Sequence, residues 1–267
     1  MSTRSFSLLK GIAALVGIGL LLALTWPRDE HRSGSQSGEH LLLYCAAGLR
    51  DPVQTIITDY QRTYGVTIDV QYGGSGTLLS SLKISQRGDL YLAADAYHMD
   101  LAVHGGLVGE TIPIARQYLV LVTRAGNPKA IRELKDLTRP EVRVAYANPE
   151  IASAGKTIRK VMEKMNLWET AQRQAAVFKP TVSDVANDVV LGSVDVGVVW
   201  NPLVALYPGL EAIHTQELDA QSEQICIGVL ASSTKTKQAL HFSRYLSAID
   251  HGLAVFQRSG YAIEHRP

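Results

Sequence analysis

The chain has 267 residues, of which 46% are hydrophobic, and it carries 26 lysine and arginine residues against 25 aspartate and glutamate residues. A chain of this length can bury a large core in one or two domains. Its balanced charge argues against nucleic acid or an anionic membrane surface as the main partner. A small anionic ligand is not excluded, because backbone N–H groups and hydroxyls bind anions without net positive charge.

The first 26 residues have the features of an export signal. Arg4 and Lys10 supply positive charge, and an uncharged, strongly apolar run extends from Gly11 to Trp26. This run is shorter than the roughly 20 residues of a standard transmembrane helix and fits the core of a signal peptide. No clear cleavage site follows it, so residues 1–26 are either a cleaved signal peptide or a retained N-terminal membrane anchor. The polar residues 27–40 are expected to form a disordered linker.

From Leu41 onward, short apolar runs alternate with stretches of helical periodicity. Apolar residues recurring every three or four positions predict a helix with one buried face, and short apolar or alternating runs predict strands. The pattern predicts strands at 41–46, 66–72, 90–94, 118–123, 142–146, 176–178, 194–200 and 225–231. It predicts helices at 52–64, 77–86, 97–104, 130–137, 155–166, 183–191, 236–249 and 252–258. Such alternation is typical of α/β proteins with parallel sheets covered on both faces.

The two cysteines, Cys45 and Cys226, both lie in predicted strands. An exported protein with two cysteines can form one disulfide. A chain with a large core does not need that cross-link, and apolar strands favour buried thiols. We therefore expect both cysteines to be buried and free.

Four junctions between a strand and the next helix are candidates for a ligand site. In open α/β sheets, ligands bind beyond the carboxyl ends of strands, where helix N-termini present unpaired N–H groups. The junctions are YCAAGL at 44–49, YGGSGTL at 72–78, ANPEIASAGKT at 147–157, and the segment from Val182 to Trp200.

Each junction also has a simpler interpretation. Ser75 and Thr77 are suited to capping a helix, and capping is weighed slightly above ligand binding for them. The AGKT at 154–157 resembles part of a nucleotide-binding loop, but Glu150 stands where that loop needs a glycine, which excludes ATP. Trp200 can donate its indole N–H to a ligand or serve only in packing.

Taken together, these segments resemble the molybdate-binding proteins of ABC transporters. The resemblance runs from about Leu41 to Tyr261 and also includes GDLYLAAD at 88–95, VLGSVDVGVVW at 190–200 and FQRSGY at 256–261. It implies the two-lobed fold of type II periplasmic binding proteins, in which each lobe is a mostly parallel sheet flanked by helices and a cleft separates the lobes. Lobe 1 would comprise residues 41–119 and 227–267, and lobe 2 residues 120–226.

The resemblance further implies a ligand-binding site for a small oxyanion, molybdate or tungstate. The protein would pass this anion to the permease of an ABC importer. The expected contacts are the Ser75 hydroxyl and the backbone N–H groups of Ala154 and Val182. Gly48 stands where the family usually has Ser, and Trp200 where it usually has Tyr. The first change removes a hydroxyl but keeps an N–H, and the second replaces a phenol O–H by an indole N–H.

Other functions stay open at this point. The chain could be a receptor for sulfate, phosphate or another anion, or a membrane-anchored sensor of anions. An enzyme is not expected, because the eight histidines show no catalytic or metal-binding spacing. No catalytic residue, metal site or cofactor is therefore predicted. We expect an exported monomer, periplasmic or tethered to the outer face of the cytoplasmic membrane, without a nucleic-acid partner.

Overall fold

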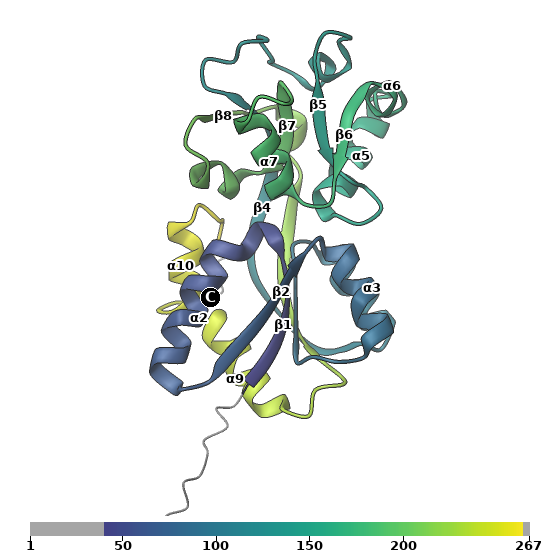
Figure 1. Ribbon diagram of the computed structural model, residues 1–267. Helices are drawn as coiled ribbons and strands as arrows, with labels where there is room; N and C mark the ends of the chain where they lie inside the picture. Colours follow the sequence, from purple (N-terminus) through teal and green to yellow (C-terminus); the bar gives the residue numbers. More distant parts are fainter. Residues whose placement is uncertain (1–39, 264–267) are drawn as a thin grey trace, which may run out of the picture. The chain divides into compact units, whose positions relative to one another are not determined.

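The computed structural model describes residues 40–263, which belong to one compact unit (Figure 1). The predicted signal peptide or anchor at 1–26 lies outside the described residues, and so does the predicted linker except for His40, which begins the first strand. Among the described residues, no helix has the length and apolar character needed to cross a membrane.

The first lobe is built on one half of a continuous sheet, with strand order β2-β1-β3-β9-β4. Its strands are β1 (His40–Ala46), β2 (Thr67–Gly73), β3 (Leu90–Ala93), β4 (Val108–Arg124) and β9 (Ser222–Leu230). The short 3-10 helix η1 (Ala47–Leu49) leads from β1 into the first long helix. The helices are α2 (Arg50–Tyr64), α3 (Ser75–Ser85), α4 (Ala96–His104), α9 (Thr236–Leu246) and α10 (Gly252–Arg258).

The second lobe is built on the other half of the sheet, where the order β4-β7-β5-β6 is completed by β8 pairing with β4. Its own strands are β5 (Val144–Ala147), β6 (Ala175–Lys179), β7 (Val196–Trp200) and β8 (Leu210–Ile213). Its helices are α5 (Ser153–Lys164), α6 (Trp168–Gln174), α7 (Val182–Val190) and α8 (Gln216–Asp219), with 3-10 turns η2 (Leu134–Thr138) and η3 (Asn201–Leu206).

Strand β4 connects the two lobes. Its first part, from Val108 to Tyr118, pairs antiparallel with β9, and its second part, from Leu119, pairs antiparallel with β7 and β8. In Figure 1, β4 passes from the lower lobe into the upper one. The sequence analysis predicted only residues 118–123 of this strand, because residues before Tyr118 are partly exposed and lack the continuous apolar run of a buried strand.

The buried side chains fall into separate clusters. One cluster contains buried residues between Leu119 and Leu218 and forms the core of the second lobe. The others draw on residues between Leu41 and Ala115 and between Ile225 and Tyr261. We keep the division into 41–119 plus 227–267 and 120–226 as a proposal, because the change of core falls close to these boundaries.

The parallel pairs place the carboxyl ends of strands from both lobes together. In the first lobe β1 lies between β2 and β3, and Ala46 is in register with Gly73. In the second lobe β5 lies between β6 and β7, and Ala147 is in register with Lys179. The predicted α/β fold is thus confirmed, with parallel pairs at the outer edges of the sheet and antiparallel pairs where β4 and β9 cross between the lobes.

Most predicted elements are confirmed to within a few residues, but the helix predicted at 130–137 is wrong. Only the 3-10 turn at Leu134–Thr138 forms there. The Asn127 side-chain amide makes two hydrogen bonds to the main chain of Ile131. It donates to the Ile131 carbonyl at 2.7 Å and accepts from the Ile131 N–H at 2.9 Å. These bonds hold the chain in a loop and keep the helix from starting. The prediction also omitted α6, α8 and β8, which are short.

Neither cysteine forms a disulfide, as predicted, but only Cys45 is fully buried. Burial raises the pKa of the Cys45 thiol well above its usual value, so the thiol stays protonated and unreactive. Cys226 is half-buried. Strand β3 lies between the two strands that carry the cysteines, which separates the thiols across the sheet.

Candidate functional site

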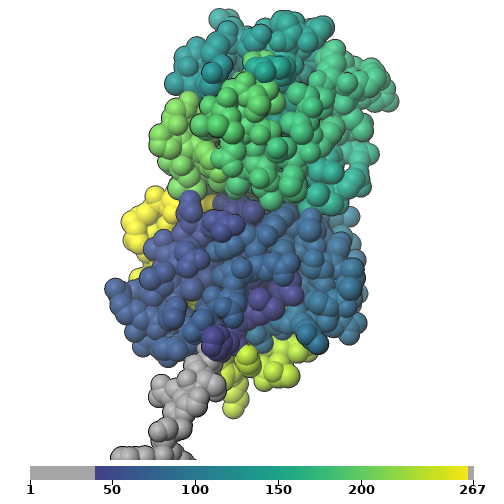
Figure 2. All heavy atoms as spheres, in the orientation of Figure 1, coloured from purple at the N-terminus to yellow at the C-terminus, as the bar shows by residue number. Residues whose placement is uncertain are grey.

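A small cavity of about 20 Å³ lies where the carboxyl ends of the parallel strands of both lobes meet. Figure 2 shows the two lobes in contact at their junction on the viewed face. The cavity is lined by Ala46, Ala47, Gly48, Gly73, Gly74, Ser75, Ala94, Ala152, Ser153, Ala154, Thr181, Val182 and Trp200. None of these residues is charged. Pockets for organic ligands usually measure about 300–1,000 Å³, so this cavity suits a solute of only a few atoms.

All five residues predicted to bind a ligand line this cavity. Gly48 follows β1, Ser75 begins α3, and Trp200 ends β7, while Ala154 and Val182 lie in the first turns of α5 and α7. The structure therefore brings together residues that are far apart in the sequence. The parallel registers of β1 with β2 and of β5 with β6 make this possible, because each pair of strands ends at the same edge of the sheet.

The helices that start at the cavity offer unpaired N–H groups. Helix α5 has no side-chain cap, and among the described residues the N–H groups of Ser153 and Ala154 meet no acceptor. Thr181 caps α7 by accepting from the N–H of Asp184, which leaves the Val182 N–H unpaired within the described chain. The partial positive charge at a helix start favours an anion there.

Ser75 is a cavity residue and not a helix cap, so the capping hypothesis is wrong for it. Its neighbour Gly74 is the N-cap of α3, and no side chain caps this helix. The Ser75 hydroxyl oxygen accepts a hydrogen bond from the N–H of Ala94 at 3.2 Å, and the residue is only 1% exposed. Because the oxygen already accepts this bond, the hydroxyl hydrogen is available to donate into the cavity.

Trp200 and Gly48 form one packed pair across the junction. Trp200 is 2% exposed, and its indole N–H has no acceptor among the described residues. A Cβ atom on Gly48 would lie 3.1 Å from Cγ2 of Val182 and 3.6 Å from Cδ1 of Trp200. A side chain at position 48 would thus crowd Val182, whereas the Trp200 ring would lie at ordinary van der Waals distance. The two departures from the family pattern lie next to each other, so they act on the same part of the cavity.

Ser153 is a cavity residue that the sequence analysis did not select. It lines the cavity, is 5% exposed, and begins α5 immediately before Ala154. Its hydroxyl has no hydrogen-bond partner in the described part of the chain. The only signal in the sequence was a hydroxyl residue next to the predicted backbone donor.

Two buried tyrosines donate hydrogen bonds to the main chain of cavity residues. The Tyr91 hydroxyl donates to the carbonyl of Ser75 at 2.8 Å, and the Tyr261 hydroxyl donates to the carbonyl of Gly48 at 3.1 Å. Burial raises the pKa of both tyrosines well above the usual value, so both remain protonated donors. These bonds fix the peptide groups on either side of the ligand-facing residues.

A buried aspartate–histidine pair lies near the cavity but has no nucleophile. Asp95 accepts from the N–H of His98 at 2.7 Å, and its carboxylate lies 2.8 Å from Nδ1 of the same ring. The other ring nitrogen faces Gly76, whose Cβ position would be 3.0 Å away. The described residues also contain no group of three histidine, cysteine, aspartate or glutamate residues arranged to hold a metal ion.

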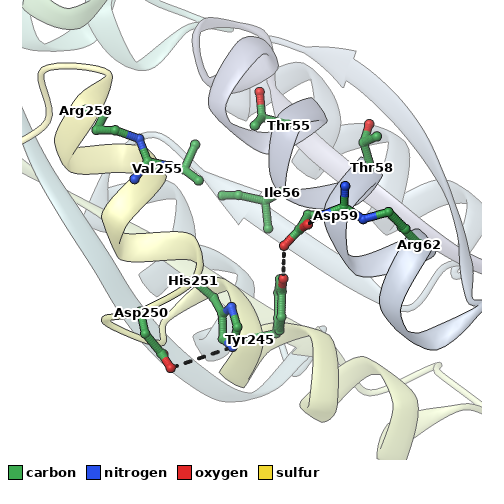
Figure 3. A pocket seen from close by; sticks show the side chains of 10 residues that line it. All are labelled: Thr55, Ile56, Thr58, Asp59, Arg62, Tyr245, Asp250, His251, Val255 and Arg258. Carbon is green, nitrogen blue, oxygen red and sulfur yellow. Dashed lines mark hydrogen bonds and ion pairs between the residues drawn. The ribbon is translucent and has the colours of Figure 1, made fainter.

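A larger hollow of about 520 Å³ lies between α2, α9 and α10 (Figure 3). Both of its carboxylates are engaged with other side chains of the hollow. Asp59 accepts from the Tyr245 hydroxyl and pairs with Arg62, and Asp250 lies 3.8 Å from Nε2 of His251. The hollow presents no buried polar group that lacks a partner, so we assign the functional site to the junction cavity.

The comparisons agree with a receptor built around this cavity. Residues 41–262 match the bacterial extracellular solute-binding protein family, and the chain belongs to this family. The family is one of solute-binding proteins, which supports the predicted class of function over an enzyme, and its extracellular character agrees with the predicted export.

Several relatives and solved structures are similar over most of the chain. The molybdate-binding protein ModA of Mycobacterium bovis is 25% identical over 239 residues, covering 88% of this chain and 89% of that protein. ModA of Escherichia coli is 23% identical over 240 residues, covering 84% and 89%. The periplasmic molybdate-binding protein of Azotobacter vinelandii has a TM-score of 0.73 at 19% identity, covering 84% of this chain and 100% of that chain. The sulfate-binding protein SubI of Mycobacterium tuberculosis has the same TM-score at 18% identity, covering 84% and 86%. These structures confirm the two-lobed periplasmic-binding-protein fold.

The support from Tyr91 can be tested by stability. Replacing Tyr91 by Phe removes the hydroxyl and leaves the buried Ser75 carbonyl without its donor, which should lower the free energy of unfolding by about 1–3 kcal/mol. Chemical denaturation measures this change. The control is Tyr97→Phe on α4, where the ring is partly exposed and no hydroxyl bond is lost. Equal stability of both variants would contradict the supporting role.

Proposed function

We propose that this protein captures molybdate or tungstate outside the cytoplasm and delivers it to an ABC importer. The observation that carries the proposal is the junction cavity, which is lined without charge and surrounded by N–H and O–H donors from both lobes. A fully ionised tetrahedral anion has no proton to donate and needs a donor at each oxygen. A buried anion whose oxygens lack hydrogen bonds is very costly, so a complete shell of donors is required.

Neutral donors are sufficient for this task. A buried arginine or lysine would have to lose its own water before it met the ligand, and this desolvation offsets much of the attraction. The N–H groups at the starts of α5 and α7 are already oriented by their helices and add partial positive charge. Uncharged donors therefore bind the anion by geometry and exclude solutes of other shapes.

The relatives support molybdate in particular. The molybdate-binding protein of Mycobacterium bovis aligns with 88% of this chain, and that of Rhodobacter capsulatus with 94% at 21% identity. The cavity residues fall within the shared region. These similarities favour molybdate or tungstate over an unrelated small solute.

Sulfate is the second candidate, because it has the same shape and charge as molybdate. A sulfate-binding protein of Synechococcus elongatus is 29% identical over 99 residues, or 34% of this chain. The Gly48–Trp200 pair changes the wall of the cavity and can alter its size, on which the choice between the two anions depends. Phosphate is less suited, because its hydrogen phosphate form carries a proton, and no carboxylate lines the cavity to accept it.

Capture requires both lobes. Gly48 and Ser75 belong to the first lobe, and Ala154, Val182 and Trp200 to the second. An anion can dock on one set in an open form, and closure about the connecting strands then adds the other set. The permease of the importer is the proposed recipient when the lobes open again. The predicted N-terminal signal or anchor would place the protein in the periplasm or at the outer face of the membrane.

The proposed function is tested by a thermal-shift panel on residues 41–267 with molybdate, tungstate, sulfate, phosphate or no anion. A ligand at about 100 times its Kd should stabilise the protein by roughly 2.7 kcal/mol. We expect a rise in Tm with molybdate and tungstate only. A rise with sulfate alone would replace molybdate by sulfate, and no rise with any anion would contradict the proposal.

The Ser75 hydroxyl is tested by Ser75→Ala. Loss of a buried donor to the anion should weaken binding by about 1–3 kcal/mol, measured by titration calorimetry with molybdate. Ser80→Ala is the matched control, because Ser80 lies on the same helix and its hydroxyl bonds only to the Gly76 carbonyl. If Ser75→Ala binds as tightly as Ser80→Ala, the hydroxyl does not contact the anion.

The indole N–H is tested by Trp200→Phe. The ring is largely kept while the donor is lost, so affinity for molybdate should fall by about 1–3 kcal/mol. Trp168→Phe is the control, since Trp168 is buried against Tyr146 and Phe178 and does not line the cavity. That variant should lose stability but keep its Kd. An unchanged Kd in Trp200→Phe would limit Trp200 to packing.

A further inference from the structure

The two glycines that flank Ser75 are packed directly against the main chain of the second lobe. A Cβ atom on Gly74 would lie 2.5 Å from the Ile151 carbonyl oxygen and 2.9 Å from the Pro180 carbonyl oxygen. A Cβ atom on Gly76 would lie 3.1 Å from both Cα and the carbonyl oxygen of Ile151. These are backbone atoms, so they cannot rotate away as a flexible side chain can.

The same loop donates hydrogen bonds across the junction. The N–H of Gly76 donates to the Ile151 carbonyl at 3.0 Å, and the N–H of Thr77 donates to the same oxygen at 3.3 Å. Both N–H groups belong to the first turn of α3, where no acceptor exists within the helix. A carbonyl of the second lobe therefore acts as the cap of a helix in the first lobe, and this cap exists only when the lobes are closed.

The position of the Ile151 carbonyl is fixed by its own loop. The Asn148 carbonyl accepts from the N–H groups of Ile151 at 3.2 Å and Ala152 at 2.9 Å, and the Asn148 N–H donates to the carbonyl of Lys179 at 2.8 Å. The turn at Asn148 leads directly into α5, whose start carries Ala154. The acceptor for α3 and the backbone donors of the second lobe thus move together.

We propose that Gly74, Gly76 and the Ile151 carbonyl form a closure latch that couples anion capture to the closing of the lobes. The inference rests on the proposed function, because the anion is the ligand whose capture the latch completes. Gly76 and Thr77 give their N–H groups to the second lobe, while the Ser75 N–H and hydroxyl remain for the anion. One loop thereby contacts both the ligand and the opposite lobe.

Other contacts across the junction tolerate a wider range of distances between the lobes. Lys156 Nζ lies 2.6 Å from the centre of the Tyr97 ring, and the Asn201 side-chain amide donates to the Gly260 carbonyl at 3.3 Å. Long or rotatable side chains make these contacts, so they can adjust to incomplete closure. The close approach at Gly74 cannot adjust in this way, and it therefore determines how completely the lobes close.

The test is Gly74→Ala, in which the added methyl group blocks closure. The backbone at Gly74 has φ −67° and ψ 144°, which alanine adopts without strain, and both nearest atoms that the methyl group would meet belong to the second lobe. We therefore expect the variant to fold. Gly109→Ala is the matched control, because a Cβ there meets no atom within 4 Å.

Binding and compaction are measured with molybdate on the wild type and both variants. Loss of the closed state should weaken molybdate binding about tenfold or more in Gly74→Ala, and small-angle X-ray scattering should show a smaller decrease in radius of gyration than in the wild type. Gly109→Ala should match the wild type in both. If Gly74→Ala binds and contracts like Gly109→Ala, the latch is overturned while the proposed function stands.

A ligand-independent measurement separates the two hypotheses. Amide hydrogen exchange at Gly76 and Thr77 reports the bonds to Ile151 directly, and we expect faster exchange in Gly74→Ala than in Gly109→Ala without any anion. If the wild type binds no tested anion, the proposed function fails and this difference still supports the latch. Equal exchange in the two variants would overturn the latch.

Discussion

Unpaired N–H groups at helix starts are the feature on which the site depends. Helices α5 and α7 begin at the cavity with main-chain donors that find no acceptor in the described chain, and such groups require a partner when they are buried. The supporting bonds from Tyr91 and Tyr261 hold the neighbouring peptide groups in place. A small anion satisfies these donors together, which explains why a cavity without any charged side chain is suited to a charged ligand.

The crossing strands give this arrangement its second property. Because β4 and β9 belong to both halves of the sheet, the donors of the two lobes can separate without unfolding either core. Closure then has two consequences at one loop. In the proposed function Ser75 meets the ligand, while Gly76 and Thr77 donate to the Ile151 carbonyl. The energetic gain from capping α3 adds to the gain from binding the anion, so each event favours the other.

Gly48 and Trp200 are the two positions where the sequence analysis expects this chain to depart from molybdate-binding proteins. A hydroxyl on a small residue and a phenol on a large one are replaced by a bare glycine and an indole. A Cβ at Gly48 would lie within van der Waals distance of the Trp200 ring, so the two positions are neighbours in the cavity wall. The side-chain donor expected at position 48 in the first lobe is lost, while position 200 in the second lobe keeps a donor in the form of an indole N–H. Selectivity among tetrahedral anions should therefore depend on both positions together.

Much of the fold and of the candidate site followed from the sequence alone. Apolar periodicity located the main strands and helices, and the order of short motifs identified the fold and selected five residues that line one cavity. Local patterns suffice for the strands and helices, because strand periodicity and strand-to-helix junctions are encoded by neighbouring residues. The five site residues and the two-lobed fold came from the resemblance to molybdate-binding proteins. The irregular stretch at 130–137 was mispredicted because the Asn127 side chain, and not apolar periodicity, determines its path.

Tertiary structure alone decided the rest. Three features depend on contacts between segments distant in the sequence: the role of Ser75, the place of Ser153 in the cavity, and the packing of Gly48 beside Val182 and Trp200. The same holds for Gly74, whose lack of a side chain matters only because two carbonyls of the other lobe approach it. The sequence determined which groups could donate, and the packing of two lobes determined which of them meet.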